Sequence, residues 1–188
     1  SRFGMELDSL SDLITFGLAP GVLVLAIMTG AGEAAPLATG GPLQTLTYVG
    51  CFFYVIASAL RLAKFNVLTE DYGKKFFFGL PTTAAGALIC SYFLTISKYQ
   101  LPLVFTQVMP LILLVFGFMM VSRLPLPKLG VREAAWINII QGGCVILSYT
   151  FGFLRIFPGF IFGCGMAYLI FGMGWALIKG IRPPVPQT

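Results

Sequence analysis

Residues 13–28 read LITFGLAPGVLVLAIM, a stretch that contains no charged side chain. About 20 mostly apolar residues in a helix cross the roughly 30 Å hydrocarbon core of a bilayer. A helix is also the open backbone conformation that satisfies its own polar groups in lipid. The stretch therefore predicts a transmembrane helix, and five later runs have the same character. The six predicted spans are residues 13–28, 45–62, 82–97, 103–121, 134–153 and 158–178.

The composition of the whole chain agrees with a membrane protein. Of its 188 residues, 57% are hydrophobic and 10% are charged, whereas soluble domains carry about 25% charged residues. So few charged groups cannot cover a water-facing surface, and the connectors between the spans leave no room for a soluble domain. We expect residues 1–188 to form one membrane-embedded domain, an all-α integral membrane protein built as a polytopic helical bundle.

The positions of lysine and arginine predict the orientation of this bundle. If the end that holds residue 1 is cytoplasmic and the six spans alternate, ten of the 12 basic residues fall on the cytoplasmic side. These are Arg2, Arg61, Lys64, Lys74, Lys75, Arg123, Lys128, Arg132, Lys179 and Arg182, against Lys98 and Arg155 on the far side. Such an excess on the cytoplasmic side is the general rule for membrane proteins. The net charge of +5 therefore indicates a basic membrane face, and no nucleic-acid partner is expected.

Glycines in the last span predict close helix contacts. Gly159 and Gly163 have the spacing of two small residues four apart, which lets helix backbones approach each other in lipid. Gly165, Gly172 and Gly174 continue the pattern.

The candidate chemistry lies in two carboxylates at the start of the first span. The chain has seven acidic residues and no histidine, so acid–base chemistry would have to use carboxylates. Asp8 and Asp12 lie where an ionised group close to hydrocarbon is costly and usually marks a functional site. Together with Gly4 they are spaced four residues apart, so on a helix all three share one face. Carboxylate oxygens suit Mg²⁺ or Mn²⁺, and a glycine lets a ligand approach the backbone.

A structural explanation of the same pair is also open. Charged residues are common at membrane interfaces, and an acidic residue at a helix N-terminus is stabilised by the helix dipole. The spacing alone does not decide between a solvated helix end and a site.

The sequence around the pair resembles a known enzyme signature. Residues 1–12, SRFGMELDSLSD, are similar to the second half of the CDP-alcohol phosphatidyltransferase signature, which reads D-x-x-D-G-x-x-A-R, a spacer, and then G-x-x-x-D-x-x-x-D. Gly4, Asp8 and Asp12 match that second half. RLAKFNV at residues 61–67 and FGLP at residues 78–81 resemble R-L-A-R-F-N and F-x-G-L-P of the phosphatidylserine synthase branch. The later helices fit the family by hydropathy alone.

Two features depart from the family pattern. Lys64 stands where that branch has arginine, which keeps the charge but loses the planar set of donors. The D-x-x-D-G-x-x-A-R half does not occur in the 188 residues, and the family spacing places it upstream of Ser1, together with two more transmembrane helices. We expect the 188 residues alone to be inactive.

The resemblance implies a metal-dependent enzyme of phospholipid biosynthesis. Its substrates would be CDP-diacylglycerol and L-serine, and its products CMP and phosphatidylserine. By the same resemblance, Asp8 is a ligand of Mg²⁺ or Mn²⁺, and Asp12 is the general base and also touches a metal. Gly4 would line the nucleotide pocket.

Arg61, Lys64 and Asn66 are the candidate substrate contacts, because the serine carboxylate and the lipid phosphate both need cationic partners. They lie at the cytoplasmic end of the second predicted span, on the same side as the aspartates. Interfacial anchoring, in which long basic side chains extend toward lipid head groups, explains the two cations equally well. Thr82 and Thr83 could bond substrate, but capping of the third helix is the simpler account.

The resemblance also implies a location, a prokaryotic cytoplasmic membrane with the active site facing the cytoplasm. Nucleotide and serine would then arrive from water while the acyl chains stay in lipid. A homodimer, as in many family members, remains open, as does an ether-linked CDP-lipid. Three other functions remain as alternatives: the same reaction with glycerol phosphate, inositol phosphate or choline, a transporter with an aspartate cation site, and a structural membrane subunit.

Overall fold

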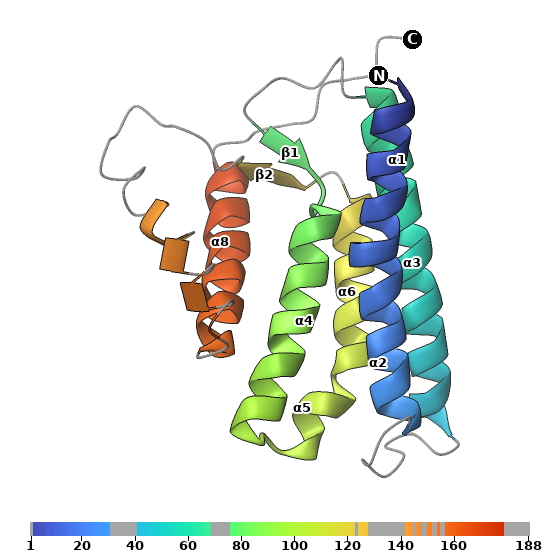
Figure 1. The fold of residues 1–188 in the computed structure, drawn as a ribbon, viewed down its shortest axis with the longest axis vertical. Helices are drawn as coiled ribbons and strands as arrows, with labels where there is room; N and C mark the ends of the chain where they lie inside the picture. The colour runs from blue at the N-terminus through green and yellow to red at the C-terminus, as the bar shows by residue number, and fades with distance from the viewer. Residues whose placement is uncertain are drawn as a thin grey trace.

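The computed structural model describes residues 2–30, 41–68, 76–122, 124–127, 142–144, 146–147, 150–151, 154 and 157–178. Figure 1 shows long helices that run side by side along one direction, with a short two-stranded ribbon near one end of the bundle. The helical elements are α1 (Arg2–Asp12), the π-helix η1 (Leu13–Leu18), α2 (Ala19–Thr29), α3 (Pro42–Leu68), α4 (Thr82–Tyr99), α5 (Leu103–Gln107), α6 (Met109–Val121) and α8 (Pro158–Ile178). The strands β1 (Phe76–Phe78) and β2 (Pro125–Pro127) pair antiparallel, with Phe77 opposite Leu126.

Four described helices are long and apolar enough to cross a membrane. They cover Phe3–Thr29, Pro42–Asn66, Leu103–Val121 and Pro158–Ala176. The predicted first, second, fourth and sixth spans are therefore confirmed as such helices, and the chain is a helical membrane protein. Apart from the three-residue strands, the described residues also confirm the all-α prediction.

The count of six spans remains a prediction. The third predicted span coincides with the helix α4, which is not apolar enough to count with these four. The fifth, residues 134–153, lies mostly outside the described residues. In Figure 1, α6 and α8 both run toward the ribbon end.

Small residues and proline allow the helices to approach closely. Lipid removes the hydrophobic drive for helix association, so packing of small residues against neighbouring backbones has to replace it. A Cβ at Gly50 of α3 would lie 2.9 Å from the Pro110 carbonyl oxygen of α6. A Cβ at Gly117 of α6 would lie 2.7 Å from the Phe53 ring of α3. These contacts hold α3 and α6 parallel.

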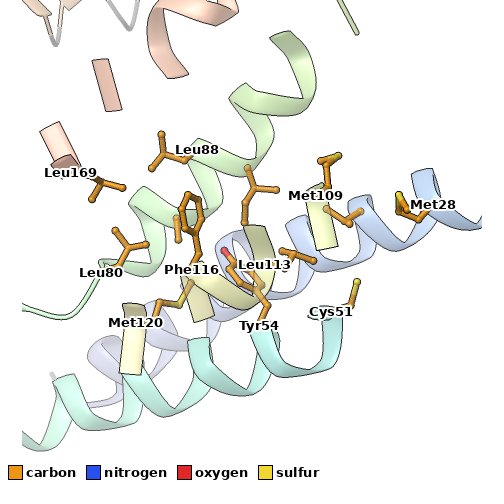
Figure 2. Packing of buried hydrophobic residues seen from close by; sticks show 13 residues of the cluster. Met28, Cys51, Tyr54, Leu80, Leu88, Met109, Leu113, Phe116, Met120 and Leu169 are labelled. Carbon is orange, nitrogen blue, oxygen red and sulfur yellow. The ribbon is translucent and has the colours of Figure 1, made fainter. Parts of the chain in front are cut away.

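The core lies between α2, α3, α4 and α6. Figure 2 shows its side chains converging from these helices, and Leu169 joins from α8. Its fully buried members include Tyr54, Met28, Leu80, Met109, Leu113 and Met120. Many other large apolar side chains point outward, such as Phe52 (74% exposed) and Phe171 (76% exposed). Outward apolar side chains of this kind are expected where lipid, not water, surrounds the bundle.

Only some of the α8 glycines make the close helix contacts that their spacing predicts. A Cβ at Gly159 would contact Thr95 at 3.6 Å, and one at Gly165 would lie 2.6 Å from the side chain of Leu88. These two glycines therefore face α4 in an antiparallel pairing. At Gly163 and Gly174 a Cβ would meet no described atom within 4 Å. For these two, close packing is not found among the described residues.

Candidate functional site

Asp8 and Asp12 lie one helical turn apart in the second half of α1. Asp8 is exposed and Asp12, the last residue of α1, is half-buried. Residues four apart are neighbours on a helix surface, and the two charges act on each other. Gly4 lies one turn before Asp8 and is exposed. The structure thus keeps the three residues in the predicted order along one helix.

The π-helix η1 begins directly after Asp12. Its wide turn is visible in the hydrogen bond from the Ala19 N–H to the carbonyl oxygen of Ile14, five residues earlier. Pro20 has no N–H, so the carbonyl of Phe16 lacks its usual donor four residues later. The hydroxyl of Tyr54 on α3 donates to that carbonyl instead, over 2.8 Å.

Two neighbouring helices press against this turn. A Cβ at Gly17 would lie 3.0 Å from the Cβ of Ser58 on α3. A Cβ at Gly86 of α4 would lie 3.0 Å from the Cα, Cβ and carbonyl oxygen of Phe16. The backbone that follows Asp12 is therefore held from two sides by close contacts, which fixes the base of the predicted site.

Arg61 connects three helices at the end of the bundle that carries the aspartates. Its Nη1 donates to the Thr82 hydroxyl oxygen over 3.3 Å. Its guanidinium carbon lies 5.5 Å from the centroid of the Phe65 ring, one turn further along α3. Its charge and that of Asp12 also act on each other. Arg61 is half-buried, which reduces the screening of this interaction by water.

A second contact joins α1 and α3 at the same end. The Ser9 hydroxyl donates to the Asn66 side-chain oxygen over 3.2 Å, and the Asn66 amide donates to the Ser9 hydroxyl over 2.9 Å. Lys64 lies three residues after Arg61 on α3 and is half-buried. Of the predicted site residues, the structure links Asp8, Asp12 and Arg61 through their charges and brings Asn66 to the helix that carries the aspartates.

Two residues of this constellation have roles that the sequence does not predict. The prediction that Thr82 and Thr83 cap α4 is wrong, because Pro81 occupies the cap position and the helix has no side-chain capping bond. Thr82 is instead fully buried and accepts the hydrogen bond from Arg61. Ser9 becomes the partner of Asn66. The sequence gives one weak signal for each role. Ser9 directly follows Asp8, and Thr82 directly follows the FGLP block.

The carboxylate pair is suited to a hard cation, as part of a larger ligand set. Among the described residues, no group of three or more histidine, cysteine, aspartate or glutamate side chains could hold a metal ion. Mg²⁺ often takes one or two carboxylates and completes its shell with water and substrate phosphates. An exposed Asp8 and a half-buried Asp12 beside it match that mode of binding. The two carboxylates thus fit a metal ion, and metal dependence itself stays a prediction.

Comparison with known proteins places this constellation in an enzyme family. The family model described as CDP-alcohol phosphatidyltransferase matches residues 1–125, a region that contains every predicted site residue. A CDP-diacylglycerol–serine O-phosphatidyltransferase of Helicobacter pylori is 29% identical over 174 residues, which cover 92% of this chain and 67% of the relative. The archaetidylserine synthase of Methanothermobacter thermautotrophicus is 34% identical over 126 residues, or 67% of this chain and 46% of the relative. A CDP-diacylglycerol–serine O-phosphatidyltransferase of Bacillus subtilis is 36% identical over 89 residues, 46% of this chain and 41% of the relative.

Proposed function

The chain belongs to the CDP-alcohol phosphatidyltransferase family, and on that premise we propose that it makes phosphatidylserine. In the proposed reaction a phosphatidyl group passes from CDP-diacylglycerol to the hydroxyl of L-serine, and CMP is released. The relatives support serine as the acceptor, because the names of the two bacterial relatives and of the archaeal relative all contain serine. The lipid part of the archaeal name, archaetidyl, differs from that of the bacterial names. The observation that carries the proposal is the gathering of Asp8, Asp12 and Arg61 at one end of the bundle.

Asp12 is the proposed general base. It would take the proton of the serine hydroxyl, whose oxygen forms a bond to the lipid-bearing phosphorus. The bond from that phosphorus to the oxygen it shares with the CMP phosphate breaks, and CMP leaves with the electron pair. A half-buried carboxylate next to a second one is less well solvated than a surface aspartate. Such a group is better suited to accept a proton at neutral pH.

Asp8 and Asp12 are the proposed holders of Mg²⁺ or Mn²⁺. A divalent ion at this position would offset negative charge on the phosphoryl oxygens. Arg61 is the proposed partner of an anionic substrate group, because its planar guanidinium matches carboxylate and phosphate geometry. Lys64, Asn66 and Gly4 stay proposed substrate contacts. Of these, Asn66 already has an internal partner in Ser9, so it would have to share or exchange that bond.

We place the site at the cytoplasmic face of a prokaryotic membrane. The described basic side chains support this orientation, since Arg61 and Lys64 lie at the aspartate end of α3 and Lys98 lies in the last turn of α4 at the other end. Nucleotide and serine then reach the aspartates from water. The acyl chains of the lipid stay in the bilayer beside the apolar helix faces.

The proposal is tested with the product of the complete gene, including any residues that precede Ser1. The protein is purified in detergent, and CMP release from CDP-diacylglycerol is followed with L-serine, glycerol 3-phosphate or inositol phosphate, with Mg²⁺, Mn²⁺ or a chelator. We expect release with serine only, dependent on the metal and lost in Asp12→Asn. Glu6→Gln is the matched control, because Glu6 is an exposed carboxylate on the same helix. Release with another alcohol alone would refute the serine assignment, and no release from folded protein with any alcohol would refute the transferase.

A further inference from the structure

We propose that Thr82 is a positioning residue for the transfer reaction, and that its hydroxyl oxygen holds the Arg61 guanidinium in one orientation at the aspartate end of the bundle. The inference rests on the proposed function in one respect, since it takes Arg61 to be the partner of an anionic substrate group. It assigns no contact with substrate to Thr82 itself.

Two contacts fix the plane of the guanidinium. The hydrogen bond to Thr82 restrains one edge, over 3.3 Å. The Phe65 ring, 5.5 Å from the guanidinium carbon, restrains one face. A planar group that is held at an edge and at a face cannot rotate freely about its long side chain. The remaining N–H donors of Arg61 are then presented in a fixed direction before substrate arrives.

The position of Thr82 is itself set by the end of α6. The Gly79 N–H donates to the Leu124 carbonyl over 2.8 Å, and the Leu80 N–H donates to the Met119 carbonyl over 3.0 Å. Gly79 has a φ of +83°, and a Cβ there would lie 2.5 Å from the Met120 carbonyl oxygen. The segment before α4 is therefore bound backbone to backbone, and α4 begins at a fixed point.

Burial makes Thr82 a suitable anchor. Thr82 is 0% exposed, so water does not compete with Arg61 for its hydroxyl oxygen. Preorganisation of this kind lowers the entropy lost when a ligand binds, because the long arginine side chain is already ordered. Without the hydroxyl, Arg61 would have to be ordered by the substrate, and affinity for the anionic group would fall.

Isosteric variants separate positioning from simple packing. Thr82→Val keeps the shape and removes the hydroxyl, whereas Thr82→Ser keeps the hydroxyl. Taking the serine carboxylate as the anionic group that Arg61 binds, we expect Thr82→Val to raise the KM for serine about tenfold, the size of one lost hydrogen bond to a charged group. The KM for CDP-diacylglycerol should change little, and Thr82→Ser should resemble the wild type. A structural role would instead lower the yield of folded protein and leave both KM values of the folded fraction unchanged.

A double-mutant cycle with Arg61→Lys tests whether Thr82 acts through Arg61. Lysine keeps the charge and loses the planar donors. If Thr82 serves Arg61, the Thr82→Val change should have no further effect on the KM for serine in the Arg61→Lys background. Additive effects of the two changes would overturn the inference.

A chemical measurement gives an answer that does not depend on turnover. Arg61 is modified with an arginine-selective dicarbonyl reagent, and the rate is followed by mass spectrometry of the peptide that contains it. We expect Arg61 to react several times faster in Thr82→Val than in the wild type or in Thr82→Ser. Equal rates would overturn the inference. If the protein proves not to use serine, the proposed function fails while this rate comparison still decides the role of Thr82.

Discussion

The Tyr54 hydroxyl donates a hydrogen bond to the backbone carbonyl of Phe16 over 2.8 Å, and this contact joins α3 to the π-helix that follows Asp12. A π-helix holds more residues per turn than an α-helix, so it rotates the face of α1 relative to the face of α2. Pro20 removes the donor that Phe16 would otherwise use. Tyr54 therefore stabilises the turn that sets the direction of the aspartate face, and π turns occur often at functional sites.

Removal of the Tyr54 hydroxyl should destabilise the protein. Tyr54 is 0% exposed, and Tyr54→Phe would leave the Phe16 carbonyl without this partner, at a cost of about 1–3 kcal/mol. Thermal unfolding in detergent should show a lower Tm for this variant. Tyr48→Phe is the matched control, because Tyr48 lies on the same helix with 46% exposure and should change the Tm little. An equal fall in Tm for both variants would show that the bond to Phe16 contributes no more to stability than an exposed tyrosine hydroxyl does.

A methyl group at Gly86 should disturb the same turn from the α4 side. Its Cβ would lie 3.0 Å from three atoms of Phe16, two of which belong to the backbone and cannot rotate away. Gly86→Ala should therefore cost about 1–3 kcal/mol as overpacking, seen as a lower fraction of folded protein after heating and gel filtration. Gly163→Ala should be tolerated, because a Cβ there meets no described atom within 4 Å. If Gly86→Ala were as stable as Gly163→Ala, the result would contradict the close contact between α4 and the Phe16 backbone.

Hydropathy predicts where the helices lie but not how they touch. The apolar runs at residues 103–121 and 158–178 match the described helices closely. The second run ends at residue 62, whereas α3 continues to Leu68, because helical hydrogen bonds persist beyond the apolar stretch that hydropathy detects. Local sequence therefore defines the cores of these helices better than their polar ends.

The features that build the site depend on pairs of residues far apart in sequence. The π-helix has a local signal in Pro20, but the donor that satisfies Phe16 comes from Tyr54, and no sequence pattern connects the two. The bond between Arg61 and Thr82 likewise depends on how the segment before α4 docks on α6. The ribbon pairs a triple phenylalanine with Pro-Leu-Pro, and proline is unfavourable in most strands. The sequence therefore offers candidate site residues, but it indicates neither the contact between Ser9 and Asn66 nor the bond between Arg61 and Thr82.

Asp8 should contribute to metal binding more than to proton transfer, if the proposed roles hold. Asp8→Asn removes one charged oxygen ligand, and we expect a higher Mg²⁺ concentration for half-maximal CMP release. The kcat at saturating Mg²⁺ should fall less than in Asp12→Asn, since loss of a general base costs about 10²–10⁴-fold. Glu6→Gln removes a charge from the same exposed helix and should leave the Mg²⁺ dependence unchanged. An unchanged Mg²⁺ dependence in Asp8→Asn would remove Asp8 from the proposed ligand set.

The contact between Ser9 and Asn66 offers a test of whether Asn66 binds substrate or fastens two helices. Both side chains are on the outside of the bundle, Asn66 exposed and Ser9 half-buried, so the pair should add only about 0.5–1.5 kcal/mol to stability. If Asn66 acts only by holding α1 against α3, Ser9→Ala and Asn66→Ala should lower kcat/KM equally. The double variant should then be no worse than either single one.

A direct role of Asn66 gives a different result in the same cycle. Asn66→Ala would then raise the KM of one substrate, and Ser9→Ala would leave both KM values near those of the wild type. We expect this second result, because the amide of Asn66 carries two donors and a carbonyl, and only one donor and the carbonyl are used by Ser9. The steady-state kinetics of the three variants with serine and CDP-diacylglycerol varied in turn decide the matter. Equal losses in both single variants would assign Asn66 to the helix contact alone.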